Sequence, residues 1–249
     1  MSLADARTLD NNTALEADLC IIGGGAAGIA IAAEFLNTPH RILLLESGGL
    51  EPEEATQALY AGHVGGLDYN LEGSRSRYFG GSSNCWQGWC APLAPEDFEK
   101  HDWVPHSGWP ITHTDLAPYY ARAAHVLDLA SDNFNVASVY SKEETASLDG
   151  FENHMWRISR PTRHGEKYRE ALQGADNIRI LLHANVTRIA TNNNRKQVDK
   201  LEVRTLSGRR HFVRARNFVL ACGGIENARL LLASNGLGNA HGVVGRYFM

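Results

Sequence analysis

The stretch LCIIGGGAAG at residues 19–28, followed by RILLLE at residues 41–46, decides the fold of this chain. An apolar strand runs into a Gly-x-Gly-x-x-Gly turn, a helix of small residues follows, and a second apolar strand ends in a carboxylate. In such a turn Gly23 permits the tight bend, Gly25 lets the backbone approach a pyrophosphate, and Gly28 lets helix and strand pack closely. The order and spacing of these parts predict a dinucleotide-binding βαβ unit.

The expected ligand of this unit follows from the charge at the start of its helix. Unpaired N–H groups and the helix dipole favour a negative group there, so the pyrophosphate is expected at the turn, beside Ala27. Glu46 lies at the spacing expected for a carboxylate that accepts hydrogen bonds from ribose hydroxyls.

Composition excludes several other classes of protein. The chain has 249 residues and a formal net charge of −4, with no basic stripe, so a nucleic-acid partner is not expected. It has no apolar run of transmembrane length, and residues 1–12 are polar, without the features of a secretory signal. We therefore expect a cytoplasmic protein without a membrane segment, although export beside a signal-bearing partner would leave no mark.

The cysteines indicate neither disulfides nor a metal site. Four cysteines are too few for a disulfide framework in a chain of this length. Cys20 and Cys222 fall in apolar strands and are expected as small buried hydrophobes. Cys85 and Cys90 are too far apart for a Cys-x-x-Cys pair, so no bound metal is expected.

The second half of the chain predicts more strands. Alternation of apolar and polar residues predicts strands at 178–182, 185–190, 198–205 and 210–214, and a buried apolar strand at 217–221. Turn residues separate the strands at 185–190, 198–205 and 210–214, which is typical of a β-meander. Helices are expected at 26–37, 116–129 and 165–174. The predicted fold class is α/β: a Rossmann-like parallel sheet of the FAD/NAD(P)-binding type with a three-stranded antiparallel β-meander crossover. A plain nicotinamide-binding domain has no reason to contain that meander.

Three separated motifs resemble the glucose–methanol–choline (GMC) oxidoreductases, flavoenzymes that oxidise alcohols. They are IIGGGAAG at residues 21–28, GGSSNCW at 80–86 and VLACGGIENAR at 219–229. The sequence around the second motif, from Tyr78 to Leu93, is most similar to the pyranose-oxidase and sugar-dehydrogenase branch. The resemblance covers essentially the whole chain and implies FAD as the cofactor.

The resemblance also implies further cofactor contacts. The Gly-Gly-Ser-Ser turn would pass along the flavin, the backbone of Val186 would pair with the adenine edge, and residues 221–224 would close over the dinucleotide. Each has a simpler alternative: a surface turn, an ordinary strand valine, and a plain strand-to-helix turn. The contacts expected beyond the βαβ unit are Gly80, Gly81, Ser82, Asn84, Cys85, Val186, Ala221 and Gly223.

Two departures from the family pattern concern the second motif. Trp86 replaces an asparagine of choline-type members, which argues against that branch. Cys85 replaces a histidine that is often bonded covalently to the flavin in the pyranose-oxidase branch. A histidyl linkage is thus excluded at this position, and a non-covalent flavin is favoured over a thioether to Cys85.

No catalytic residue is assigned within these 249 residues. In the family a histidine base lies in a C-terminal part that would follow residue 249. The histidines of this chain at 101, 106, 113, 154 and 164 are candidates by residue type alone. We therefore expect residues 1–249 to be an FAD-binding domain that is incomplete, with the substrate domain absent.

The expected function is oxidation of a CH–OH group of a sugar, glycoside or polyol, with hydride transfer to the flavin and an electron acceptor as partner. The alternative is a truncated FAD-binding fragment without catalytic activity.

Overall fold

The computed structural model describes residues 2–141, 144–145, 149–151 and 153–247, and the chain divides into two compact units. The first unit comprises Met1–Cys85 together with Arg163–Met249, and the second comprises Trp86–Thr162. No helix in the described residues has both the length and the apolar character needed to cross a membrane.

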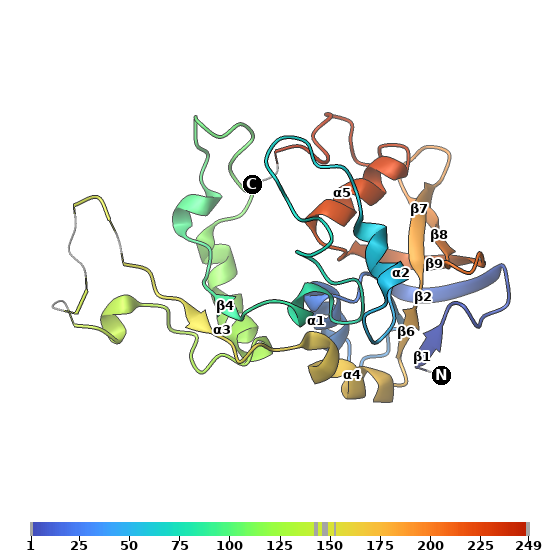
Figure 1. The fold of residues 1–249 in the computed structure, drawn as a ribbon, viewed down its shortest axis with the longest axis horizontal. Coiled ribbons are helices and arrows are strands. Elements are labelled where there is room, and N and C mark those ends of the chain that lie inside the picture. Colours follow the sequence, from blue (N-terminus) through green and yellow to red (C-terminus); the bar gives the residue numbers. More distant parts are fainter. Residues whose placement is uncertain (1, 142–143, 146–148, 152, 248–249) are drawn as a thin grey trace. The chain divides into compact units, whose positions relative to one another are not determined.

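A seven-stranded sheet forms the centre of the first unit, with the strand order β1-β6-β3-β2-β9-β8-β7. Its strands are β1 (Leu3–Asp5), β2 (Thr13–Ile22), β3 (Ile42–Leu45), β6 (Ile178–Leu182), β7 (Asn185–Thr191), β8 (Val198–Arg204) and β9 (Arg210–Leu220). Neighbours from β1 to β9 in that order run parallel, whereas β9, β8 and β7 pair antiparallel. The predicted α/β sheet with a three-stranded antiparallel meander is confirmed (Figure 1).

Alternating side chains of the central strands build a core on each face of this sheet. In β2, Ile21 faces the core that contains Leu172 of α4 (His164–Gly174), whereas Cys20 faces the core that contains Leu230 of α5 (Gly224–Ala233). Helix α1 (Ala26–Glu34) packs against α4, and α5 packs against β7. Continuous apolar runs in β2 and β3 follow from this arrangement, because parallel strands covered on both faces need no polar side.

The first unit differs from the sequence prediction in four respects. β1 was not predicted, since three residues in a polar segment give no alternation and the strand is held by backbone pairing to β6. The strands expected at 210–214 and 217–221 are one continuous strand, β9. Residues 218–220 are half-buried, so the expectation of a buried strand there was wrong. Helix α1 also ends three residues before the predicted position.

Short elements follow β3 in the first unit. They are α2 (Glu54–Gln57), the 3₁₀ turn η1 (Ala58–Tyr60) and the 3₁₀ turn η2 (Gly81–Asn84).

The second unit contains one long helix and little regular structure besides. Helix α3 (His113–Val126) begins and ends three residues before the predicted positions, and it is capped by Thr112, which donates its backbone N–H to Asp115 Oδ2 at 2.8 Å. The remaining elements are β4 (Trp89–Cys90) paired antiparallel with β5 (Arg157–Ile158), and the 3₁₀ turns η3 (Pro95–Phe98) and η4 (Val136–Ser138).

Candidate cofactor site

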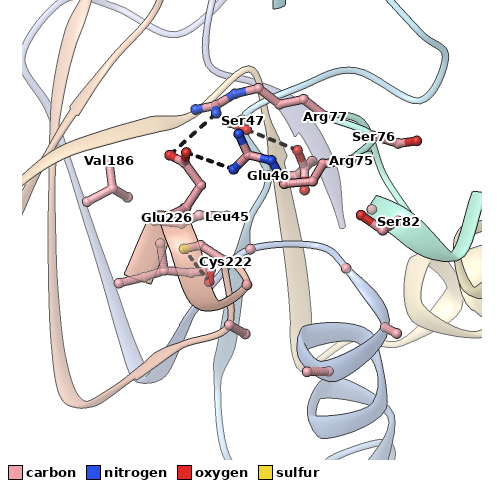
Figure 2. Close-up of a pocket in the computed structure, with 18 of the residues that line it drawn as sticks. Leu45, Glu46, Ser47, Arg75, Ser76, Arg77, Ser82, Val186, Cys222 and Glu226 are labelled. Carbon is pink, nitrogen blue, oxygen red and sulfur yellow. Dashed lines mark hydrogen bonds and ion pairs between the residues drawn. The ribbon is translucent and has the colours of Figure 1, made fainter. Parts of the chain in front are cut away.

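A cavity of about 260 Å³ lies in the first unit, where the parallel strands β2, β3 and β9 end. Turns at the carboxyl ends of parallel strands are the usual ligand position in open α/β sheets. Its lining includes Gly23, Gly25, Ala26, Ala27, Glu46, Ser47, Tyr60, Arg75, Arg77, Gly81, Ser82, Val186, Ala221, Cys222, Gly223, Glu226 and Arg229. Figure 2 shows this cavity with Ser82 and Val186 on opposite sides of the view.

Two glycines of the β2–α1 turn are required by the backbone itself. Gly23 has φ +110°, and a Cβ there would lie 2.5 Å from the carbonyl oxygen of Ala221. A Cβ at Gly28 would lie 1.9 Å from the carbonyl oxygen of Gly23. Gly23 thus makes the bend and Gly28 allows the close helix packing that the motif predicted, although Gly28 does not itself line the cavity.

The start of helix α1 offers a place for an anion. Gly25 is the N-cap residue, no side chain caps the helix, and the first turn contains no acidic residue. A Cβ at Gly25 would meet no atom closer than Gly81 Cα at 3.9 Å, so the space beside it is open. Helix N–H groups without protein acceptors favour a phosphate, and this opening therefore fits the pyrophosphate of a dinucleotide.

Glu46 stands at the end of β3 and faces the same cavity. Its Oε2 accepts the backbone N–H of Gly24 at 2.9 Å, and its Oε1 accepts that of Gly48 at 2.8 Å. The side chain is only slightly exposed. The Ser47 hydroxyl also donates to Oε1 at 3.2 Å. A carboxylate has about four acceptor positions, so Glu46 keeps one for a hydroxyl donor of a ligand.

The second glycine motif lies against the first one. The N–H of Gly80 donates to the carbonyl oxygen of Gly24 at 2.7 Å, and that of Gly81 donates to Tyr78 at 2.8 Å. A Cβ at Gly81 would lie 2.8 Å from Gly25 Cα. These two N–H groups are therefore already used, and Ser82 is the residue of this turn whose side chain Figure 2 shows at the cavity.

The structure brings together most of the predicted site residues. Gly23, Gly25, Ala27, Glu46, Gly81, Ser82, Val186, Ala221 and Gly223 line the cavity, whereas Gly28, Gly80, Asn84 and Cys85 do not.

The residues outside the lining have other contacts. Asn84 donates its Nδ2 to the carbonyl oxygen of Phe79 at 3.0 Å, and Cys85 is exposed at the end of η2. Val186 is the second residue of β7, beside a register shift.

A charged cluster in the cavity wall was missed by the sequence analysis. Glu226 of α5 lies 3.1 Å from Arg75 Nη1 and 3.7 Å from Arg77 Nη1, as Figure 2 shows, and 2.7 Å from Arg229 Nε. The guanidiniums of Arg75 and Arg77 also lie 3.9 Å and 4.7 Å from the ring centre of Tyr60. The available signal was two arginines, two positions apart, directly before the second glycine motif.

Burial and charge shift the ionisation of two groups in this wall. Burial raises the pKa of the Glu226 carboxyl, but hydrogen bonds and charges from Arg229, Arg75 and Arg77 outweigh it and leave the pKa below its usual value. Burial, with the nearby carboxylates of Glu46 and Glu226, raises the pKa of the Cys222 thiol to about 11. Glu226 is therefore ionised at neutral pH, and Cys222 is a neutral thiol.

Comparison with known proteins gives one family match over nearly the whole chain. The model of the family described as FAD dependent oxidoreductase matches residues 18–244. This match confirms an FAD-dependent oxidoreductase domain and FAD as the cofactor, as the three motifs indicated.

Two curated relatives are similar at low identity. One is 2-methyl-1,2-propanediol dehydrogenase of Mycolicibacterium austroafricanum, 25% identical, with 94% of this chain and 55% of the relative covered. The other is the FAD, quinone glucose dehydrogenase of Drosophila pseudoobscura pseudoobscura, 25% identical, with 90% and 44% covered. The chain spans about half the length of the curated relatives it matches.

Solved structures show the same fold. A formate oxidase matches with a TM-score of 0.56 and 19% identity, over 91% of this chain and 48% of the other. A pyridoxine 4-oxidase from Mesorbium loti matches with a TM-score of 0.50 and 22% identity, over 87% and 51%. In both cases this chain aligns with about half of the longer protein.

Proposed function

The chain belongs to the FAD dependent oxidoreductase family, and on that premise we propose that it is the FAD-binding part of a GMC-type enzyme that oxidises a CH–OH group. The observation that supports this proposal best is the single cavity wall shared by the glycine turn of α1, Glu46 and Ser82. These groups come from three separate motifs and suit the phosphates, the ribose and the flavin of one extended ligand.

We assign a role to each group of residues. Gly25, Ala27 and the open first turn of α1 bind the pyrophosphate, while Gly23 and Gly28 hold that turn in place. Glu46 accepts the ribose hydroxyls, and the backbone at Val186 contacts the adenine. Gly80, Gly81, Ser82, Asn84 and Cys85 form or support the turn along the flavin, and Ala221 and Gly223 close over the dinucleotide.

The bound flavin supplies the two-electron acceptor for alcohol oxidation. The protein supplies a wall for it in which the carboxylates of Glu46 and Glu226 are buried. Helix N–H groups offset the diphosphate charge, and Glu46 orients the ribose because its carboxylate is already fixed by two backbone donors. Non-covalent attachment is the simplest arrangement, since Cys85 does not line the cavity and its Sγ contacts the carbonyl oxygen of Ser82 at 3.4 Å.

A sugar, glycoside or polyol is the substrate class that we propose. Support comes from the names of the two curated relatives, which refer to a propanediol and to glucose. The resemblance of residues 78–93 to the sugar-oxidising branch points the same way. The electron acceptor is a separate partner, and a cytoplasmic site of action is proposed from composition alone.

We further propose that the catalytic base is supplied from outside residues 1–249. Within the described part of the chain, no histidine lines the cavity. Each matched relative is about twice as long as the aligned portion. The same observation supports a second candidate, an FAD-binding chain that has no activity of its own.

Anaerobic reduction of the bound flavin distinguishes the two candidates. The FAD-loaded chain is mixed with glucose, a methyl glycoside, glycerol or 2-methyl-1,2-propanediol, and the flavin absorbance is followed. Because the base is proposed to lie outside residues 1–249, the assay is run with and without added imidazole, which can act as a general base in place of a missing histidine. Bleaching by one of these alcohols in either mixture supports the enzyme. FAD binding without bleaching in both mixtures, alongside chemical reduction by dithionite, supports the non-catalytic chain.

A further inference from the structure

The charged cluster around Glu226 contains more arginine side chains than carboxylates. Three guanidiniums, from Arg75, Arg77 and Arg229, surround one carboxylate at 3.1, 3.7 and 2.7 Å. Glu46, the other carboxylate of the same lining, is hydrogen-bonded to backbone N–H groups. The cavity therefore has a net positive wall, which suits a ligand with negative charge.

Arg77 has an unused donor in this wall. Its side chain is only 10% exposed, and within the described part of the chain its Nε finds no hydrogen-bond partner. A buried guanidinium N–H without an acceptor is costly, so such groups normally meet an acceptor from the protein, water or a ligand. The Nη1 atom is directed to Glu226, and the face of the group lies on Tyr60, which fixes the guanidinium without satisfying Nε.

The position of Arg77 indicates which half of the cofactor it would meet. In Figure 2 its guanidinium lies beside Glu226, on the same side of the view as Val186, whereas Ser82 lies on the other side. The proposed function places the adenosine at Glu46 and Val186 and the flavin at Ser82. An arginine on the side of Val186 would therefore contact the adenosine diphosphate half of FAD.

We propose that Arg77, whose side chain lines the cavity, binds the ADP half of FAD through its guanidinium and its positive charge. Glu226 and Tyr60 hold its guanidinium in the cavity wall, and Arg75 adds a second positive charge beside it. This inference rests on the proposed assignment of Glu46 and Val186. The alternative is that the cluster only ties the segment before η2 to helix α5.

The test compares FAD binding by the wild-type chain, R77M and R77K. Flavin fluorescence is titrated with the deflavinated protein, and ADP is used as a competitor. Because a hydrogen bond to a charged group contributes about tenfold or more in affinity, R77M is expected to raise the Kd for FAD by about that factor. The inhibition constant of ADP should rise by a similar factor. R77K keeps the charge but not the planar guanidinium donors, and an intermediate loss is expected.

The matched control is R214M. Arg214 is a half-exposed arginine of β9 whose Nε lies 4.0 Å from Asp199, and it does not line the cavity. Its replacement should leave the Kd for FAD and the inhibition constant of ADP within about twofold of the wild-type values, because exposed ion pairs contribute little. Thermal unfolding of the deflavinated variants checks that each one folds, and R77K, the milder change, replaces R77M if R77M does not.

Each outcome has one meaning. A parallel loss of FAD and ADP affinity supports the proposal. Unchanged FAD affinity in R77M overturns it, and so does a weaker FAD affinity with unchanged ADP competition, which indicates a purely structural cluster. A wild-type chain that binds no FAD contradicts the proposed function itself.

Discussion

Glu46 Oε2 accepts the backbone N–H of Gly24 at 2.9 Å, and this hydrogen bond joins the end of β3 to the glycine turn before α1. The other carboxylate oxygen accepts the N–H of Gly48 at 2.8 Å. The side chain proposed to bind ribose thus also fixes the backbone on both sides of the ribose position. Cofactor affinity and local stability are therefore coupled at this residue.

Replacing Glu46 should lower both the affinity for FAD and the stability of the fold. In E46A two buried N–H donors lose their acceptor, and an unsatisfied buried donor costs about 1–3 kcal/mol. We expect a lower free energy of unfolding from urea titration and a markedly weaker FAD affinity. E202Q, a change of a β8 carboxylate away from the cavity, is the control. Unchanged FAD affinity in E46A would refute the ribose assignment.

Two alanine variants in the same glycine motif should behave oppositely. In G28A the new Cβ would lie 1.9 Å from the carbonyl oxygen of Gly23, so the helix must shift away from the strand. Overpacking of this kind costs about 1–3 kcal/mol or more, which a thermal melt would detect. In G25A the Cβ enters open space, 3.9 Å from its nearest neighbour, and the fold should be kept while FAD binding is weakened. Equal stability of the two variants contradicts this account.

The stability of the first unit should fall at acidic pH because of a histidine between two carboxylates. His183 Nε2 lies 2.9 Å from Glu53 Oε1, and its Nδ1 lies 3.0 Å from Asp5 Oδ2. The hydrogen bond from His183 lowers the pKa of Glu53. Burial opposes ionisation of Asp5, but hydrogen bonds from Arg7 and the charge of His183 lower its pKa overall.

The sign follows from these two shifts. A carboxyl whose pKa is lower in the folded protein than in the unfolded chain stabilises the fold at pH values above its unfolded pKa. This contribution is lost as pH falls through the folded pKa. The usual pKa values are 4.5 for the Glu53 carboxyl and 3.8 for the Asp5 carboxyl, so the loss should begin as pH falls towards about 4.5. Urea titrations at pH 7 and pH 4 should show a smaller difference for E53Q than for wild type. If the change in unfolding free energy between pH 7 and pH 4 were the same in E53Q and wild type, the contacts of His183 with the two carboxylates would not contribute to the pH dependence.

The four cysteines should differ in reactivity towards iodoacetamide at pH 8. Cys85 is exposed, whereas Cys20 and Cys90 are buried. Cys222 lines the cavity, but its pKa is raised to about 11, and thiolate is the reactive form. Peptide mass spectrometry should find Cys85 modified first, and added FAD should protect Cys222 further. Rapid labelling of Cys222 in the FAD-loaded chain would contradict its place in the cofactor cavity.

Much of the fold could be predicted because the decisive signals are local. The glycine motif at residues 21–28 requires a positive φ at Gly23 and close packing at Gly28, and both requirements are visible in the sequence. The meander was predictable from alternation between polar turns. Three-residue β1 was not, since it depends on pairing with a strand more than 170 residues away.

The candidate site was predicted less completely for a similar reason. Gly23, Gly25 and Glu46 belong to one short motif, so their spacing alone identified them. The cluster of Tyr60, Arg75 and Glu226 joins three distant segments, and no spacing rule links an arginine in a loop to a carboxylate 151 residues later. Only the tertiary structure brings these side chains into one cavity wall.

Visible absorption of the purified chain tests the central claim most directly. The chain is incubated with FAD, passed through a gel-filtration column, and its spectrum is compared with that of the supernatant after acid precipitation. We predict flavin bands that elute with the protein in one-to-one ratio and move fully to the acid supernatant. A folded, colourless chain that retains no FAD would contradict the account, and flavin kept in the acid pellet would contradict non-covalent binding.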